Sequence, residues 1–163
     1  MESVLIRKAT VVDAIELSQL LNEDAILRHD LNVSDTSAQP LEFFEQLTEW
    51  CRDEDVETCV IVAHERAVGA ISLSHMDPAG GTAQIGYWVG SRHRRHGYCT
   101  RAFQLMLERA RQQGIATIRA TVDEGNIAGR RVLEHAGAAT HPTSDGKVFC
   151  ELRLAHHAEP ASC

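Results

Sequence analysis

Residues 85–103 constrain the fold more than any other stretch, because they join an apolar strand to a helix through a short basic loop. The run 85–89 is apolar and aromatic, which is typical of a buried strand. From Gly97 onward, apolar residues recur with helical spacing. The N–H groups of a first helical turn have no partner within the helix, and the macrodipole places partial positive charge there. The stretch therefore predicts a phosphate site at the start of the helix. Its loop carries Arg92, His93, Arg94, Arg95 and His96.

The order of residues in this loop narrows the choice of phosphate ligand. Arg94-x-x-Gly97-x-Cys99 resembles the R/Q-x-x-G-x-G/A pyrophosphate loop of the GNAT acetyltransferase superfamily. The surrounding segment is similar to the Y-W-L…Y-R-G-K-G-Y-A-T-E-A run of the branch that contains the ribosomal-protein N-terminal (alanine) acetyltransferases. Cys99 stands where the family has Gly or Ala, and Arg101 stands where this branch often has Glu. The residues that match the branch are Tyr87, Trp88, Val89, Arg94, Gly97, Tyr98, Thr100 and Ala102.

Residues 121–137 carry a second resemblance, to the superfamily's strand followed by N-x-x-S-x-x-x-L-x-x-x-G-F. Asn126 matches the Asn that helps to hold the pantetheine arm of the cofactor. Gly129 replaces the usual Ser, and Ala138 replaces the usual Phe. Taken alone, Asn126 is better explained as a helix N-cap, for which Asn is a preferred residue, and it can serve both purposes. The matching positions are Asn126, Leu133 and Gly137.

Apolar periodicity and turn signals predict the remaining elements. The spacing of Thr10 and Asp13 suits a capping box with Asp in place of Glu, which opens the first helix. The segment between the first two helices is expected to be a loop or a broken helix that lines a substrate cleft. Helices are expected at about 10–22, 40–50, 97–113 and 126–137, and strands at 3–8, 58–63, 68–73, 82–89, 115–122, 138–141 and 147–154, with the second and third strands joined near Glu65 and Arg66.

The resulting order, β-α-α-β-β-β-α-β-α-β-β, is that of the GNAT fold, which the resemblance implies. The expected class is α/β (α+β): a mixed, mostly antiparallel central sheet of about six to seven strands, flanked by four helices. The strand–helix–strand unit around Gly97 should form one parallel pair in that sheet.

The 163-residue chain is expected to be a single domain over residues 1–155, followed by a flexible tail at 156–163. No apolar run has membrane-spanning length, and Arg7 and Lys8 interrupt the opening apolar stretch, which argues against a signal peptide. The five cysteines are scattered without a C-x-x-C pair, so a reduced, cytoplasmic setting fits best. The formal net charge of −7 argues against general nucleic-acid binding and favours a cationic substrate or partner.

The family resemblance implies transfer of an acetyl group from acetyl-CoA, a cosubstrate, directly to an amine. It places the pyrophosphate on the N–H groups of residues 95–100. The pantetheine arm would lie along the central strand near Trp88 and Val89 and pair with its backbone like an added strand. A backbone N–H near Val89 would polarise the thioester carbonyl. The implied cofactor-binding residues are Trp88, Val89, Arg94, Arg95, His96, Gly97, Tyr98, Cys99, Thr100 and Asn126.

The usual proton carriers of the family are missing. Many relatives use a Glu on the central strand as the base, and the matching residue here, Gln84, cannot take up a proton. Many also place a Tyr acid in the helix after Asn126, a region held here by Val132 and Leu133. His75 is the preferred replacement, because an imidazole titrates near neutral pH. An ordinary surface-turn histidine is the competing interpretation, and water-relayed deprotonation is also open. The other candidates are Asp77, His141 and Asp145.

The main hypothesis is an acetyl-CoA-dependent N-acetyltransferase. Its acceptor would be a small amine or a protein N-terminus, selected by the segment 29–39 and by the hairpin around Lys147. The alternative is a non-catalytic acyl-CoA-binding module of the same fold, which the missing proton carriers favour. A third hypothesis, a nucleotide-phosphate binder of another fold, lacks both the G-x-x-x-x-G-K-[ST] and the G-x-G-x-x-G loop. No metal is expected, since the histidines lack ligand spacing, and no nucleic-acid or membrane partner is expected. Acyl donors longer than acetyl and a homodimer are left open.

Overall fold

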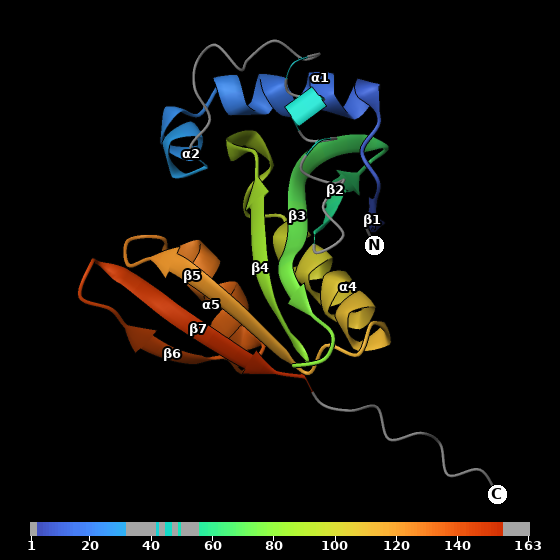
Figure 1. Ribbon diagram of the computed structural model, residues 1–163. Coiled ribbons are helices and arrows are strands. Elements are labelled where there is room, and N and C mark those ends of the chain that lie inside the picture. Colours follow the sequence, from blue (N-terminus) through green and yellow to red (C-terminus); the bar gives the residue numbers. More distant parts are fainter. Residues whose placement is uncertain (1–2, 32–41, 43–44, 47–48, 50–55, 155–163) are drawn as a thin grey trace, which may run out of the picture.

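The computed structural model describes residues 3–31, 42, 45–46, 49 and 56–154. In this part of the chain, seven strands form one sheet in the order β1-β2-β3-β4-β5-β7-β6 (Figure 1). Neighbouring strands are antiparallel except for β4 and β5, so the expected mixed sheet with one parallel pair is confirmed. The strands are β1 (Val4–Arg7), β2 (Glu57–Ala63), β3 (Arg66–Asp77), β4 (Thr82–Val89), β5 (Thr117–Asp123), β6 (Ala139–Pro142) and β7 (Lys147–Arg153). The helices in the same ranges are α1 (Val11–Asn22), α2 (Ala25–Asp30), α4 (Tyr98–Gln112) and α5 (Ile127–His135), with the short 3-10 helix η2 (Ser91–His93).

The apolar run of β2 is continuous because helices cover both faces of the sheet. Cys59 and Ile61 point into the larger core, which includes the buried residues of α4 and α5. Val60 and Val62 alternate with them and point the other way, into a smaller cluster with Leu17 of α1. The sheet is therefore sandwiched between α4 and α5 on one face and α1 on the other.

The parallel pair β4–β5 is short, and the two strands then diverge (Figure 1). Their register covers the pairs Thr82–Thr117, Ala83–Ile118 and Gln84–Arg119 only. β4 stays paired with β3 as far as Val89, while β5 stays paired with β7 as far as Asp123. Among the described residues, the backbone of 85–89 thus has no strand partner on the side that faces β5. This divergence positions the site described below.

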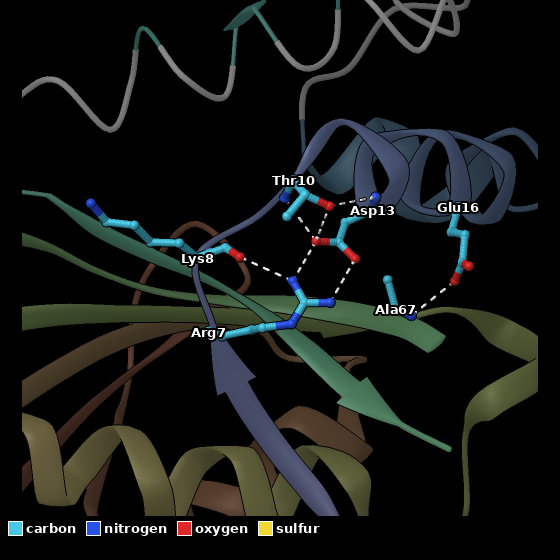
Figure 2. Close-up of polar contacts among 6 residues, drawn as sticks. All are labelled: Arg7, Lys8, Thr10, Asp13, Glu16 and Ala67. Carbon is cyan, nitrogen blue, oxygen red and sulfur yellow. Dashed lines mark hydrogen bonds and ion pairs between the residues drawn. The ribbon is translucent and has the colours of Figure 1, made fainter. Parts of the chain in front are cut away.

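Polar contacts at the N-terminus of α1 fasten it to the sheet (Figure 2). The Thr10 hydroxyl accepts the Asp13 N–H at 3.4 Å, and the Asp13 carboxylate accepts the Thr10 N–H at 2.7 Å, which confirms the expected capping box. Arg7, at the end of β1, donates to both carboxylate oxygens of Asp13 at 2.6 and 3.0 Å. Glu16 accepts the N–H of Ala67, in β3, at 2.8 Å. These bonds tie α1 to two strands of the sheet.

Strand β3 is longer than the expected 68–73. It continues to Asp77 because its polar end still pairs with β4, across a bulge that follows Ser74. The preceding turn consists of His64 and Glu65, whose φ angles are 51° and 64°, so it lies one residue earlier than expected.

The region after α1 contains a short helix where a loop or broken helix is expected. This is α2, and its N-cap is Asp24, whose carboxylate accepts the N–H of Leu27 at 2.9 Å. The helix expected at 40–50 lies largely outside the described residues, and the tail at 156–163 lies wholly outside them. None of the helices in the described ranges is long and apolar enough to cross a membrane.

Candidate functional site

The divergence of β4 and β5 begins at Gln84, the expected position of a catalytic base. Gln84 is exposed and pairs in register with Ser74 of β3 and Arg119 of β5. Its neighbours Ala83 and Ile85 point into the core beneath α4, so Gln84 lies on the opposite face. An uncharged amide therefore stands at the point where the strands part, and it can donate or accept hydrogen bonds but cannot carry a proton away.

His75 lies next to Ser74, the residue that pairs with Gln84. It is exposed in the bulge of β3, and its φ of 49° is uncommon for a residue other than glycine. Its Nδ1 is 3.3 Å from the Ser74 hydroxyl oxygen. The strand register thus places His75 one position away from the Ser74–Gln84 pair.

The remaining proton-carrier candidates occupy turns or a distant strand. Asp77 accepts the Gly80 N–H at 3.0 Å and closes the β3–β4 turn. The hydroxyl of Thr143 donates to Asp145 and holds the pKa of that carboxyl below its ordinary value. His141 lies on β6, which β5 and β7 separate from β4. Within the described residues, no three His, Cys, Asp or Glu side chains are grouped as a metal site.

The N-terminus of α4 lies at the end of the loop that follows β4. Gly97 is its N-cap with a φ of 76°, and no described side chain caps the first turn. The first helical bond runs from the Arg101 N–H to the Gly97 carbonyl at 3.0 Å, so the preceding amides have no intrahelical acceptor. A Cβ built on Gly97 would meet nothing within 4 Å, which leaves this end of the helix open. The arrangement suits an anion, as the sequence predicts.

The loop's arginines do not share one environment. Arg94 donates through Nε to the Val89 carbonyl at 3.2 Å and through Nη2 to Asp24 at 2.8 Å. Arg92 forms an ion pair with Glu23. Arg95, by contrast, is exposed, has a φ of 67°, and forms no ion pair with any other described residue.

The first turn of α4 is packed beneath the exposed end of the loop. The ring of Tyr98 is buried and stacks on the exposed ring of His96, with centroids 5.2 Å apart. Burial raises the pKa of the Cys99 thiol to about 12, so this thiol is protonated at neutral pH. Thr100 is exposed. The small Cys99 side chain thus fills space behind the amides, whereas His96 and Thr100 border the open side.

Asn126 is the N-cap of α5. Its side-chain oxygen accepts the Gly129 N–H at 3.0 Å. A Cβ on residue 129 would lie 2.7 Å from the Asn126 amide nitrogen, so glycine in place of the family's Ser leaves room for this cap. The hydroxyl of Tyr87 donates to the Gly129 carbonyl at 2.7 Å and links β4 to α5, and burial raises the pKa of this phenol.

Trp88 and Val89 present different surfaces. Trp88 is half-buried and packs against the cluster beneath α1, while the side chain of Val89 is buried in the larger core. Glu23 and Asp24, the partners of Arg92 and Arg94, were not among the residues that the sequence indicates. A single sequence carries no signal for ion pairs that span about 70 residues.

The family comparison covers most of the chain. A model described as the acetyltransferase (GNAT) domain matches residues 3–139. Among curated proteins, a sequence search finds no significant match.

Three solved structures resemble the described fold along nearly their whole length. A probable acetyltransferase has a TM-score of 0.78 at 21% identity, and the match covers 92% of each chain. The microcin self-immunity acetyltransferase MccE, solved with acetyl-CoA and AMP, has a TM-score of 0.76 at 18% identity, with 93% of this chain and 92% of that chain covered. RimL, a ribosomal-protein alpha-N-acetyltransferase in complex with coenzyme A, has a TM-score of 0.75 at 17% identity, with 93% and 94% covered. At such identities the likeness concerns the fold, and it confirms the fold that the sequence predicts.

Proposed function

The chain belongs to the GNAT acetyltransferase family, and we propose that it transfers the acetyl group of acetyl-CoA to a primary amine of a small molecule or of a protein N-terminus. The observation that carries this proposal is the divergence of β4 from β5, which leads to the open N-terminus of α4. The diverging strand offers backbone groups at 85–89 to an extended arm. The helix offers N–H groups to a pyrophosphate. A thioester on a long arm that ends in a diphosphate needs both features in this order.

Three parts of this chain would hold acetyl-CoA. The amides of the first turn of α4, with Arg95 and His96 beside them, would bind the pyrophosphate through hydrogen bonds and charge. The backbone near Trp88 and Val89 would pair with the pantetheine arm and polarise the thioester carbonyl. Asn126 caps α5 through its oxygen, and its amide nitrogen would donate to the arm.

In the reaction, the amine nitrogen attacks the thioester carbonyl carbon, a C–N bond forms and the C–S bond breaks. The sulfur leaves as a thiolate, and the amine must give up a proton. We assign the removal of this proton to His75, because it is exposed one position from the pair that marks the parting of the strands. Gln84 would orient the acceptor or a water molecule by hydrogen bonding. A thiolate needs little help from an acid, so the absence of a Tyr near Leu133 is compatible with turnover.

The cofactor half of the proposal is tested by thermal unfolding with and without acetyl-CoA. A ligand at one hundred times its Kd stabilises the native state by about 2.7 kcal/mol, which raises Tm by roughly 5–10 °C for a chain of this size. Gly97→Glu should abolish the shift, because its carboxylate would face the pyrophosphate. Gly97→Gln is the matched control: it carries the same backbone strain at a φ of 76° without the charge, and it should keep part of the shift. No shift in the wild type would sink the assignment of acetyl-CoA.

The catalytic half of the proposal is tested by measuring the release of free CoA from acetyl-CoA in the presence of a panel of amines and N-terminal peptides. Turnover with any of them supports the transferase. A specific observation favours a second candidate, a non-catalytic acyl-CoA-binding module: Gln84 stands where a base is expected. Binding of acetyl-CoA with no turnover across the whole panel would select that alternative.

A further inference from the structure

The loop at 90–97 is attached to the corner between α1 and α2 by three contacts. Gly90 lies so close to α1 that a Cβ on it would be 2.7 Å from a methyl carbon of Leu20. Arg92 pairs with Glu23, the C-cap of α1. Arg94 pairs with the N-cap of α2, Asp24. The end of β4 and the start of α2 therefore lie side by side, as Figure 1 also shows.

The guanidinium of Arg94 is bonded on two sides. Its Nε donates to the carbonyl of Val89, the last residue of β4, at 3.2 Å, and its Nη2 donates to Asp24 Oδ2 at 2.8 Å. The other oxygen of Asp24 caps α2 by accepting the Leu27 N–H at 2.9 Å. The Asp24 side chain is 11% exposed and the Arg94 side chain is 49% exposed, so water screens this pair mainly from the side of the arginine.

A second arginine connects the two helices at this corner. Arg28, in α2, donates to the carbonyls of Leu21 and Asn22 at 2.9 and 2.8 Å and so satisfies the end of α1. With Arg28 on one side and Arg94 on the other, α2 is held both to the helix before it and to the strand end beside the loop.

We propose that Arg94 is a positioning residue that holds the N-terminus of α2 against the end of β4, and that the pyrophosphate is left to the amides of α4 and to Arg95. The second half of this proposal rests on the proposed function. The sequence motif alone gives Arg94 to the phosphate, yet its Nε and Nη2 are directed at Val89 and Asp24. Arg95, one residue closer to the helix, is exposed and has no ion-pair partner in the described ranges.

Three variants separate the two roles. Asp24→Asn keeps an oxygen that can cap α2, since Asn is as good an N-cap as Asp, but it removes the acceptor for Arg94. Arg94→Gln removes the guanidinium itself. Arg95→Gln is the matched control, with the same substitution one position later. Amide hydrogen exchange over Ala25–Asp30 reports the anchoring of α2, and calorimetric titration gives the Kd for acetyl-CoA.

We expect Asp24→Asn and Arg94→Gln to speed exchange in α2 by about three- to tenfold, the range for losing a partly buried charged hydrogen bond. Arg94→Lys, which can still reach Asp24, should restore part of the protection. Arg95→Gln should leave exchange in α2 unchanged and weaken acetyl-CoA by about five- to tenfold, clearly more than Arg94→Gln does.

The proposal is overturned if Arg94→Gln weakens acetyl-CoA as much as Arg95→Gln does while exchange in α2 stays at the wild-type rate. Unchanged exchange in Asp24→Asn would overturn it as well, because the ion pair would then not anchor the helix. If the wild type binds no acetyl-CoA, the proposed function fails, and the exchange rates alone decide whether Arg94 positions α2.

Discussion

At the scale of single residues, Gln84 raises the question of where the proton of the acceptor amine goes. Its amide stands where the strands part, and it pairs in register with Ser74, the neighbour of His75. His75→Asn is a suitable probe, because Asn tolerates the positive φ of 49° that the backbone of His75 adopts in the bulge. We expect this variant to lower kcat/KM by about 100-fold, at the lower end of what a general base contributes.

The control for this prediction is His141→Asn, an exposed histidine on β6 that lies three strands from β4. This variant should keep the kcat/KM of the wild type. Gln84→Glu completes the set: a carboxylate there would restore the family's base and should recover rate in the His75→Asn background. If His75→Asn keeps the kcat/KM of the wild type, deprotonation runs through water and His75 is an ordinary surface residue.

At the scale of elements, one buried carboxylate fastens the N-terminus of α1 to β1. Asp13 is 4% exposed and accepts bonds from Arg7 and Thr10 (Figure 2). Burial pushes the pKa of Asp13 upward, but the bonds from Arg7 and Thr10 outweigh burial and hold the pKa below its ordinary value. A carboxyl with a depressed folded pKa contributes stability that is fully present above its unfolded pKa of about 3.9 and is lost as pH falls through the folded pKa.

Asp13→Asn should therefore destabilise the protein at pH 7 by about 1–2 kcal/mol, the lower part of the range for a charged hydrogen bond, since Arg7 is partly exposed. The deficit should shrink as the pH is lowered from 5 toward 2, because the wild-type carboxyl becomes protonated. Urea unfolding midpoints at several pH values measure it. Asp30→Asn, which changes an exposed carboxylate at the end of α2, is the control. A deficit independent of pH would show that the ion pair contributes nothing beyond the cap.

The elements that the sequence could predict are those with a strong local signal. The run 85–89 and the helix from Gly97 combine apolar periodicity with a glycine at a positive φ, and the capping box at Thr10 is local to four residues. The end of β3 has no such signal, because its residues after Leu73 are mostly polar and its pairing with β4 resumes at Asp77 only after a bulge. α2 has six residues, too few to show an apolar periodicity, and the only sequence signal for it is its N-cap residue, Asp24.

At the scale of the whole molecule, the motif predicts where a cofactor would bind but does not assign the side chains there. The position of the anion site follows from the helix end and from Gly97, which are local. The partners of Arg94 depend on how α2 packs against the end of β4, which brings residues about 70 positions apart into contact. Asn126 differs, because its role as a cap is predicted from the sequence, and only the close fit of its side chain against Gly129 needs the structure.

Net charge leads to a prediction that concerns the entire chain. With 16 basic and 23 acidic residues the protein is anionic at neutral pH, although the donor site carries a basic loop. Its long-range field should draw cationic acceptors and repel anionic ones, and salt should screen both effects because the Debye length falls from about 14 Å at 0.05 M to about 4 Å at 0.5 M. We expect kcat/KM for lysine amide to fall by about two- to fivefold over this range, while that for glutamate amide stays level or rises.

Initial rates at saturating acetyl-CoA, with choline chloride in place of sodium chloride as a control for specific ions, measure the difference. Equal salt dependence for both amides would mean that acceptors are selected by contacts at the site alone, and the search for the natural acceptor should then weigh shape before charge.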